Sequence, residues 1–310
     1  MRSGFVSIIG RPNAGKSTLL NKLTGEKLAI VTPKPQTTRN RITGIVNVKR
    51  KGSRPAGQIV FVDTPGVHTV GDKLNKRMMQ EVTDALEGCD LILYIVDAAE
   101  RSLKDEQFTL DLVKRQGTKT FLLLNKIDLI DKGKLLPMIE AWSERHNFAE
   151  IIPIAASKAE GLEDLLTAVA RALPEGPKYF PEDQVTDQPE RFIVAEFIRE
   201  AVLMETHEEV PYSASVLIEN YEELGKLTRI SAAIYCERTG QKAIIIGKQG
   251  SMLKAIGTRA RKEIEKLLGT KVYLELFVKV KANWRDSAQF VDETLDWRKQ
   301  IEMLGEKRKG

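Results

Sequence analysis

The sequence predicts an α/β fold with a mainly parallel sheet, followed by a smaller α+β domain. Over residues 1–172, short apolar runs alternate with amphipathic helical stretches, which is typical of βαβ units. A glycine-rich loop that fits G-x-x-x-x-G-K-[ST] directly follows the first apolar run. Pro174-Glu-Gly-Pro177 then ends the alternation, and strands and helices follow in a different order.

In the first domain each element is predicted from its periodicity and its flanking breakers. Buried strands are expected at residues 5–9, 59–62, 91–96, 120–124 and 151–154. Residues 44–48 end before the turn-prone stretch 51–57, so they should form an antiparallel edge strand in a hairpin with residues 59–62. Helical periodicity is found at residues 17–23, 73–86, 105–115, 135–145 and 161–173.

The second half of the chain carries a different set of elements. A helix is expected near residues 190–204, strands at 213–219 and 228–236, a basic helix at 251–268 and a last strand at 271–279. The tail from about residue 288 is helical in pattern and then becomes charged. The predicted domains are residues 1–175, a linker at 176–189, residues 190–285, and a tail at 286–310.

Composition limits the class of protein. The 310 residues are 42% apolar and 29% charged, as in globular proteins, and no apolar run approaches the eighteen or so residues of a membrane span. The loop at Gly10 leaves no room for a targeting peptide. Cys89 and Cys236 are too few and too isolated for a disulfide framework or a zinc site, which suits a reducing cytoplasm. We also expect the protein to be a monomer.

The net charge of +5 is distributed unevenly along the chain. It is about +6 over residues 1–180, about −10 over 181–225 and about +9 over 226–310. A basic module at the C-terminal end suggests a partner that carries phosphates. Charge alone leaves an ordinary solvated surface as an equal alternative.

The loop Gly10-Arg-Pro-Asn-Ala-Gly15-Lys16-Ser17 is expected to hold a triphosphate. Backbone N–H groups of such a loop curl around phosphates, and its glycines let the chain approach. Lys16 should reach the β- and γ-phosphates, and Ser17 should offer an oxygen to Mg²⁺. The residues predicted to bind phosphate are Asn13, Ala14, Gly15, Lys16, Ser17, Thr18 and Gly66.

Two further segments are expected to complete a magnesium site and to act as switches. Asp63 follows a predicted strand, where a carboxylate can hold Mg²⁺, and the Gly66 N–H can reach the γ-phosphate. A threonine hydroxyl from residues 32–39 can join the ion only while the γ-phosphate is present; Thr37 and Thr38 both remain candidates, and we favour Thr38. The predicted switch residues are Thr37, Thr38, Asp63, Thr64, Pro65, Gly66 and Val67.

Asn125-Lys126-Ile-Asp128 predicts which base is bound. A carboxylate can accept two parallel hydrogen bonds from guanine N1–H and N2–H, and adenine offers no such pair, so Asp128 should select guanine. Asn125 can bond the base edge and nearby loops, and the Lys126 stem can lie over the ring. Ala155, Ala156 and Ser157 follow the last strand, where the Ala156 N–H is expected to contact guanine O6.

Gly247-Lys248-Gln249-Gly250 is a G-x-x-G loop followed by a basic helix. Such a loop can clamp the backbone of about four single-stranded nucleotides, and basic side chains add attraction to phosphates. The preceding isoleucines would form an apolar shelf for bases, whereas most apolar residues of the basic helix should lie in the core. The predicted RNA contacts are Gly247, Lys248, Gln249, Gly250, Ile245, Ile246, Lys254, Arg259, Arg261 and Lys262.

In this order, these motifs resemble those of the TRAFAC-class small GTPases. Over nearly the whole chain the sequence is similar to the bacterial ribosome-assembly GTPases, which carry a C-terminal type II KH domain. The resemblance implies GTP and GDP as ligands with Mg²⁺. It also implies the 3′ end of small-subunit ribosomal RNA and the small ribosomal subunit as partners. Ala155 replaces the serine that usually begins the last guanine motif, so only a backbone contact is expected there.

The resemblance also predicts how hydrolysis differs from that of other GTPases. Val67 stands where many GTPases have a glutamine that orients water, so intrinsic hydrolysis should be slow. His68 is a weaker candidate for that role. In related GTPases an asparagine at the position of Asn13 helps to coordinate potassium, which makes potassium-stimulated hydrolysis a hypothesis.

An alternative function is a membrane-associated or protein-binding regulatory GTPase whose KH-like domain is not primarily an RNA reader. Lys307-Arg-Lys309 would support a weak peripheral contact with the inner membrane. Nothing in the residues of the G-x-x-G loop specifies an RNA sequence.

Overall fold

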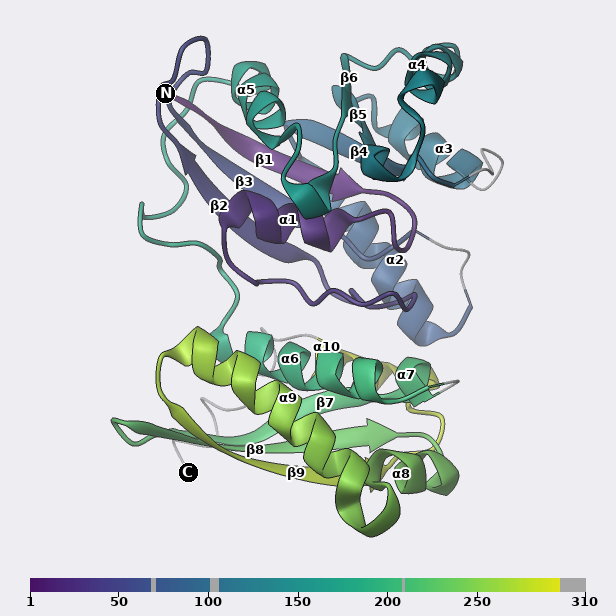
Figure 1. Ribbon diagram of the computed structural model, residues 1–310, viewed down its shortest axis with the longest axis vertical. Helices are drawn as coiled ribbons and strands as arrows, with labels where there is room; N and C mark the ends of the chain where they lie inside the picture. Colours follow the sequence, from purple (N-terminus) through teal and green to yellow (C-terminus); the bar gives the residue numbers. More distant parts are fainter. Residues whose placement is uncertain (68–70, 101–105, 208–209, 296–310) are drawn as a thin grey trace. The chain divides into compact units, whose positions relative to one another are not determined.

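The computed structural model describes residues 1–67, 71–100, 106–207 and 210–295 (Figure 1). Its contacts divide the chain into two units. The first contains Met1–Ala29, Thr38–Thr69 and Met78–Asp187, and the second contains Ile30–Thr37, Val70–Arg77 and Gln188–Gly310. Two short segments from the first half of the chain therefore belong to the second unit; one of them contains Thr37, whereas Thr38 belongs to the first unit. Residues 30–39 are called the first-switch segment below.

The first unit is built on a six-stranded sheet with the order β2-β3-β1-β4-β5-β6. All neighbours are parallel except β2 and β3, which form the predicted antiparallel hairpin. The strands are β1 (Arg2–Ile9), β2 (Ile42–Val48), β3 (Gly57–Asp63), β4 (Leu91–Asp97), β5 (Thr120–Asn125) and β6 (Glu150–Pro153). The chain turns one way after β1 and the other way after β4, so the loops after these two neighbouring strands flank a topological switch point, where such sheets bind ligands.

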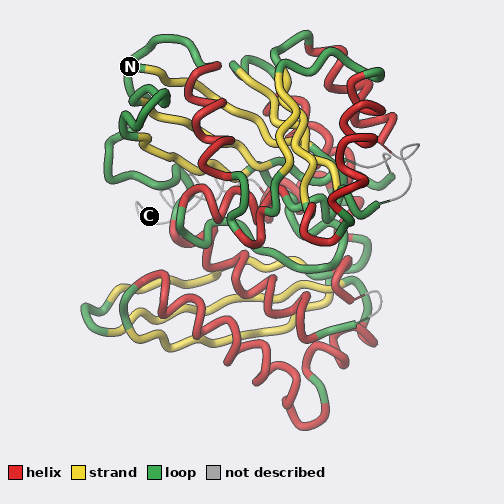
Figure 2. Tube along the Cα trace, turned by 45° about the horizontal axis from the view of Figure 1, so that its top comes forward, coloured by secondary structure: helices red, strands yellow, loops and turns green. Residues whose placement is uncertain are grey.

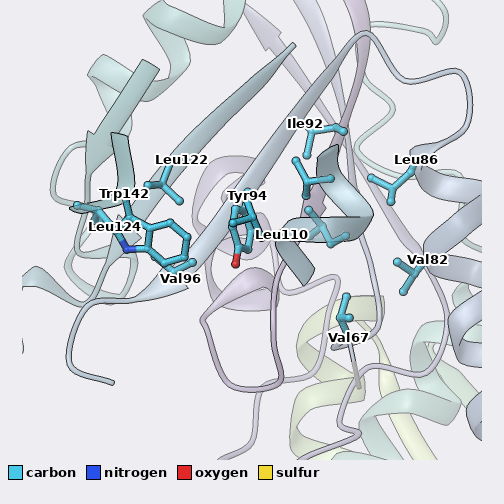
Figure 3. Close-up of a cluster of buried hydrophobic side chains, with 12 residues drawn as sticks. Val67, Val82, Leu86, Ile92, Tyr94, Val96, Leu110, Leu122, Leu124 and Trp142 are labelled. Carbon is cyan, nitrogen blue, oxygen red and sulfur yellow. The ribbon is translucent and has the colours of Figure 1, made fainter. Parts of the chain in front are cut away.

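Helices cover both faces of this sheet. They are α1 (Lys16–Thr24), α2 (Lys73–Leu86), α3 (Gln107–Gln116), α4 (Leu135–Ser143) and α5 (Leu162–Ala172). Figure 3 shows one half of the core, where Val82, Leu110 and Trp142 from α2, α3 and α4 pack on alternate residues of β4 and β5. The intervening residues of β4 are also fully buried and face the side on which α1 and α5 lie, which is why residues 91–96 are all apolar.

Most of the predicted linker packs along the first unit. The Gln58 side chain accepts hydrogen bonds from the backbone N–H groups of Tyr179 and Phe180, at 2.8 and 3.0 Å. Further on, Val185 O accepts a hydrogen bond from Ile45 N, at 2.8 Å. The proline-rich composition was a correct indication that helices and strands end here, but the segment is held in place by these bonds.

The second unit contains a three-stranded sheet with the order β7-β8-β9. β7 and β8 are antiparallel and β8 and β9 are parallel, which is the predicted type II order. Its elements are α6 (Glu190–Glu205), α7 (Val210–Ser213), β7 (Ser215–Glu223), β8 (Leu227–Cys236), α8 (Thr239–Ile246), α9 (Ser251–Leu268), β9 (Lys271–Val280) and α10 (Ala288–Leu295). The predicted fold class is thus confirmed, while α7 and α8 were not predicted.

Two long helices, α6 and α9, pack on each other and on this sheet, as Figures 1 and 2 show. Ile256 and Ile264 of α9 are fully buried, so the amphipathic stripe of the basic helix forms core as expected. On α10, Phe290 lies edge-on against Tyr235, with ring centroids 4.9 Å apart. Among the described residues, no helix combines the length and the apolar composition that a membrane crossing requires.

Candidate functional site

The loop between β1 and α1 has the backbone geometry of a phosphate cradle. Gly15 is left-handed, with φ of 104°, and a Cβ there would lie 2.2 Å from Asn125 Nδ2. A Cβ on Gly10 would lie 2.3 Å from Ile95 O. Asn13 also has a positive φ and is exposed, whereas Ala14 is buried. Gly10 is therefore required by its close approach to the backbone of Ile95, and Gly15 by its positive φ beside the Asn125 side chain, as the motif indicated.

Lys16 lies inside this loop. Its ammonium donates hydrogen bonds to the carbonyl oxygens of Gly10 and Arg11, at 2.9 and 2.8 Å. Burial lowers the pKa of Lys16 to about 8, and the nearby Asp63 and Glu106 carboxylates partly oppose this by favouring the charged form. The Lys16 ammonium is bonded to carbonyl oxygens and shielded from water. It can therefore exchange these hydrogen bonds for bonds to phosphate oxygens.

Three oxygen-bearing side chains meet beside Lys16. Ser17 Oγ donates to Asp63 Oδ2, at 2.6 Å, and lies 2.9 Å from Thr38 Oγ1. The Thr37 hydroxyl instead donates to Lys34 O, at 2.6 Å. The geometry therefore brings Thr38, and not Thr37, to the side chains predicted to hold magnesium.

Asp63 is fully buried at the end of β3. Within the described part of the chain its Oδ1 makes no hydrogen bond. Burial raises the pKa of Asp63 to about 6, against the opposing effects of Lys16 and of the Ser17 hydroxyl. An enclosed carboxylate oxygen of this kind, beside two hydroxyls, is a donor set that suits a hard cation.

The predicted second switch starts directly after Asp63. Thr64 Oγ1 donates to Ile8 O, at 2.8 Å, and Val67 N donates to Gly10 O, at 3.1 Å. A Cβ on Gly66 would lie 2.8 Å from Pro12, so this glycine sits against the phosphate loop. Val67 belongs to the buried cluster of Figure 3. His68 lies outside the described residues.

Asn125 connects three segments of the base side of the site. Its Nδ2 donates to Ala14 O, at 2.8 Å, and its Oδ1 accepts from Ala156 N, at 3.0 Å. Its backbone carbonyl accepts from Ala98 N, at 2.8 Å. This side chain therefore ties the phosphate loop to the last guanine motif and to the end of β4.

The Ala156 amide is already engaged in this arrangement. The prediction that it contacts guanine O6 therefore requires that it share its hydrogen with Asn125 or leave that residue. Ala155 is buried, and its N–H donates to Glu160 O, at 3.1 Å, while Ser157 is exposed. The loss of a serine side chain at Ala155 leaves this backbone turn in place.

Both ionisable residues of the guanine motif have partners. Lys126 Nζ lies 2.5 Å from Asp97 Oδ2, and Lys126 is held in the left-handed region with φ of 66°. Asp128 Oδ2 lies 3.4 Å from the ammonium of Lys158, a side chain that is largely exposed. Asp97 and Lys158 were not predicted, although Asp97 could have been found as the residue that ends the neighbouring parallel strand.

In the second unit, the first-switch segment is fixed by α6. The Glu200 carboxylate accepts a hydrogen bond from Val31 N, at 3.0 Å, and the Lys34 ammonium donates to carbonyl oxygens at the end of the helix. Arg199 donates to Thr37 O and pairs with Glu196, with an Nε–Oε1 distance of 2.8 Å. Sequence reasoning missed these acidic and basic residues, because on a helix they were indistinguishable from a solvated surface.

The G-x-x-G loop has the backbone geometry that its glycines imply. Gly247, Gln249 and Gly250 all have positive φ, and a Cβ on Gly247 would lie 2.6 Å from Met252 Cβ. Lys248 and Gln249 are exposed at the tip. The loop thus turns sharply and presents its backbone and two polar side chains to solvent.

A groove of about 490 Å³ runs from this loop between α9 and the edge strand β9. Its lining residues are Gly250, Leu253, Lys254, Gly257, Thr258, Arg261, Val272, Tyr273, Leu274 and Leu276. Lys254 and Arg261 were predicted as contacts, but Leu253 was expected to be core. Gly257 and Thr258 could have been found from their helical spacing of three and four residues from Lys254 and Arg261.

The structure buries the side chain of one predicted RNA contact and places two others away from the groove. Ile245 is 0% exposed, because residues 239–246 form a helix, α8, that turns this side chain into the core. Ile246 is half-buried. Arg259 pairs with Glu205, at 2.5 Å, and Arg259 and Lys262 are not among the residues that line the groove.

Comparisons with known proteins agree with both sites. Residues 5–126 match the family described as "50S ribosome-binding GTPase", and residues 209–285 match the family described as "KH domain". The GTPase Era of Geobacter sp. (strain M21) is 51% identical over 94% of this chain and 97% of its own length. GTPase Era of Syntrophus aciditrophicus is 49% identical over 94% of each chain.

Two solved structures are also similar. A single-residue variant of Aquifex aeolicus Era bound to GDP.AlF4⁻ has a TM-score of 0.90 and 40% identity, covering 95% of this chain and 99% of its own. An Era protein in complex with MgGDPNP and nucleotides 1506–1542 of 16S ribosomal RNA has a TM-score of 0.90 and 40% identity, covering 95% and 98%. The phosphate loop, the guanine motif and the KH groove thus occur in one chain, in the order and over the length of these relatives, and the chain belongs to the Era family of GTPases.

Proposed function

We propose that the protein is a GTP-hydrolysing switch that binds small-subunit ribosomal RNA near its 3′ end and assists assembly of the small ribosomal subunit. The observation that carries the proposal is the Asn125 bridge, which joins the phosphate loop to the guanine motif beside Asp128. The Era complex with a 16S ribosomal RNA fragment supports the RNA partner, because its chain is similar to this one over both domains.

The residues at the phosphate end fit a magnesium ion. The enclosed Asp63 carboxylate and the hydroxyls of Ser17 and Thr38 would hold it, with the nucleotide phosphates completing the shell. The ion would supply positive charge beside the β- and γ-phosphates. Lys16 binds the same phosphates by exchanging two loop carbonyls for phosphate oxygens.

Hydrolysis should be slow without activation. Val67 is buried and cannot orient the attacking water, so this chain lacks the side chain that many GTPases use at that position. Asn13 is exposed at the tip of the phosphate loop, where an added potassium ion could supply charge near the phosphates. We infer that potassium chloride raises turnover relative to sodium chloride and that Asn13→Ala removes the difference; equal wild-type rates in both salts would exclude this role.

The RNA site is assigned to the groove beside the G-x-x-G loop. Gly250 of the loop lies at one end of the groove, next in sequence to the exposed Lys248 and Gln249; Lys254 and Arg261 line one wall, and the edge of β9 lines the other. Such a groove suits single-stranded nucleotides, with phosphates at the loop and bases toward the apolar wall. The G-x-x-G loop, and not the isoleucines before it, therefore provides the first contact.

The guanine assignment is tested by base exchange at Asp128. Asp128→Asn should lose GTP and gain xanthosine triphosphate, because an amide can donate to the 2-oxo group where the carboxylate accepted two donors. The measurement is turnover with GTP, ATP and xanthosine triphosphate for both proteins. A wild-type preference for ATP, or an unchanged preference in the variant, would contradict the proposal.

A second measurement distinguishes the proposed function from its alternative, a membrane-associated or protein-binding regulator. Lys307-Arg-Lys309 lies outside the described residues. Nucleotide-dependent crosslinking to total cellular RNA should recover one ribosomal segment if the proposal holds. The proposal also implies a cytoplasmic location and the small ribosomal subunit as partner. Recovery of protein or sedimentation with lipid vesicles, without RNA, would favour the rival.

A further inference from the structure

We propose that Asp97 is a positioning residue for the base: it holds the Lys126 side chain in the place where that side chain covers the purine ring. The inference rests on the proposed guanine-nucleotide function. Asp97 lies outside the guanine motif, on a different strand. We expect it to raise the affinity for the nucleotide without affecting the choice of base.

The position of Asp97 follows from the sheet. Asp97 is the last residue of β4, and in the parallel pairing of β4 and β5 it lies opposite Asn125. The next residue of the motif, Lys126, leaves the strand in a left-handed conformation and its ammonium lies 2.5 Å from Asp97 Oδ2. A non-glycine residue with positive φ is unfavourable by itself, so neighbouring contacts must hold it.

Each oxygen of the Asp97 carboxylate has its own partner. Oδ2 faces the Lys126 ammonium, and Oδ1 accepts a hydrogen bond from Ala99 N, at 2.9 Å. The Ala98 N–H donates to Asn125 O, which ties the same turn to the next strand. The carboxylate is therefore oriented by its own loop, and it in turn orients the lysine.

The ion pair would raise nucleotide affinity because it orders the flexible Lys126 side chain before the base packs on it. A free lysine stem populates many rotamers, and a base that packs on it must select one of them. The Lys126 and Asp97 side chains are 31% and 23% exposed, so the pair is shielded from solvent more than a surface ion pair is. Because the stem would contact the ring face, which GDP and GTP share, the effect should be equal for both nucleotides.

Lys158 provides the contrast. It pairs with Asp128 over 3.4 Å, but 64% of its side chain is exposed and its partner is the carboxylate that guanine is expected to take. The Lys158–Asp128 pair therefore competes with the base for the Asp128 carboxylate, whereas the Lys126–Asp97 pair orients a side chain that the base would contact. Lys158→Gln is therefore the matched control: it removes an ammonium from the same site and should not weaken nucleotide binding.

The alternative is a purely structural role, in which Asp97 only stabilises the end of β4. Asp97→Asn separates the two roles, because the amide oxygen can still accept from Ala99 N while the charge that holds Lys126 is lost. Lys126→Met keeps a stem of similar length and removes the ammonium. If Asp97 acts through Lys126, its substitution should have no further effect once the ammonium is gone.

The experiment measures GDP and GTPγS affinity by calorimetry, and GDP dissociation with a fluorescent analogue, for the wild type, the three single variants and Asp97→Asn/Lys126→Met. We expect Asp97→Asn to weaken both nucleotides equally, by about threefold to tenfold, through faster dissociation. Its melting temperature without nucleotide should stay at the wild-type value, and the double variant should match Lys126→Met.

Three results would overturn the inference: wild-type affinity in Asp97→Asn, independent effects of Asp97→Asn and Lys126→Met that multiply in the double variant, or an equal loss in Lys158→Gln. Each of these leaves the proposed function intact, because the wild type still binds guanine nucleotides. A wild type that binds no guanine nucleotide would instead refute the proposed function and this inference together.

Discussion

At the scale of single residues, Asp63 and Lys16 show how burial prepares a site for charged ligands. Each is enclosed, and each titrates closer to neutrality than usual: the pKa of Asp63 is raised to about 6 by burial, and that of Lys16 is lowered to about 8 by burial. Both shifts disfavour the charged form that the nucleotide complex needs. A phosphate or a cation that restores the lost solvation therefore gains from both residues.

The direction of the Asp63 shift gives a pH prediction. Its folded pKa, about 6, exceeds the ordinary value of 3.8, so its contribution to stability is fully present below about pH 4 and is lost as the pH rises to 6. Cation binding requires the ionised form. The Mg²⁺ affinity of the GDP complex should therefore fall by up to about tenfold per unit below pH 6.

The measurement is a magnesium titration of the GDP-bound protein between pH 5 and 8. Asp63→Asn should bind Mg²⁺ weakly at every pH and show a flat profile over the same range. A wild-type profile that is equally flat would show that Asp63 does not titrate in this window.

Local backbone geometry that depends on a motif was predictable, and contacts that depend on a neighbouring element were not. The phosphate loop was predicted from consecutive residues, and Gly10 and Gly15 show the close contacts that the motif indicates. Ile245 was predicted to contact RNA because it is apolar and precedes the loop, but the turn of α8 places it in the core. Asp97 lies far from Lys126 in sequence, and only the pairing of β4 with β5 brings them together.

At the scale of elements, α8 shows the limit of periodicity. Residues 243–246 contain three consecutive isoleucines, a β-branched run that disfavours helix, and Gly240 near the start lowers helix propensity further. The helix forms because of its tertiary setting and its first turn, where Gln241 accepts hydrogen bonds from the backbone of Glu237 and Arg238. By contrast, α2 and α9 have clear amphipathic patterns, and both were predicted at their observed bounds.

Helix α6 carries a buried polar stripe that allows a stability prediction. Arg199 is 2% exposed and pairs with Glu196, which is also buried. Removing one partner of such a pair leaves the other charge buried, so Arg199→Met should destabilise the second unit by about 3 kcal/mol. The double variant Arg199→Met/Glu196→Gln should recover part of this loss, because no unpaired charge remains.

Hydrogen exchange of the α6 amides in the full chain measures this effect locally, and the amides of β4 in the first unit serve as the internal reference. Faster exchange in α6 alone, partly reversed in the double variant, is the expected result. Equal exchange in both single and double variants would mean that the charge of Glu196 is not what matters.

At the scale of the whole molecule, the distribution of charge along the sequence could be related to the fold, whereas the contacts of the segment between the domains could not be predicted. The basic balance of residues 226–310 coincides with the unit that contains the G-x-x-G loop and its groove. The residues between the domains were predicted as a linker from their prolines, but the bonds from Gln58 to Tyr179 and Phe180 fix this segment on the first unit. Proline content reports where regular structure ends and carries no information on what the backbone then contacts.

The groove makes a quantitative prediction about RNA binding. Single-strand binding releases counterions, so each lysine that neutralises a phosphate adds about 0.7 to the slope of log affinity against log salt concentration. Lys248 lies at the loop tip and Lys254 lines the groove, and both can contact phosphates without supporting the core. Lys248→Gln/Lys254→Gln should therefore lower the slope by about 1.4 and weaken binding of all sequences alike.

This pair of substitutions tests the groove more cleanly than aspartates at the two glycines of the loop. A side chain at Gly247 would collide with Met252, so such a variant could lose RNA binding through misfolding alone. Lys132→Gln/Lys134→Gln is the matched control, because both lysines are exposed in the first unit and the net charge changes equally. If long-range attraction to the whole basic protein dominates, both double variants change the slope alike; if phosphates are held in the groove, only the first does.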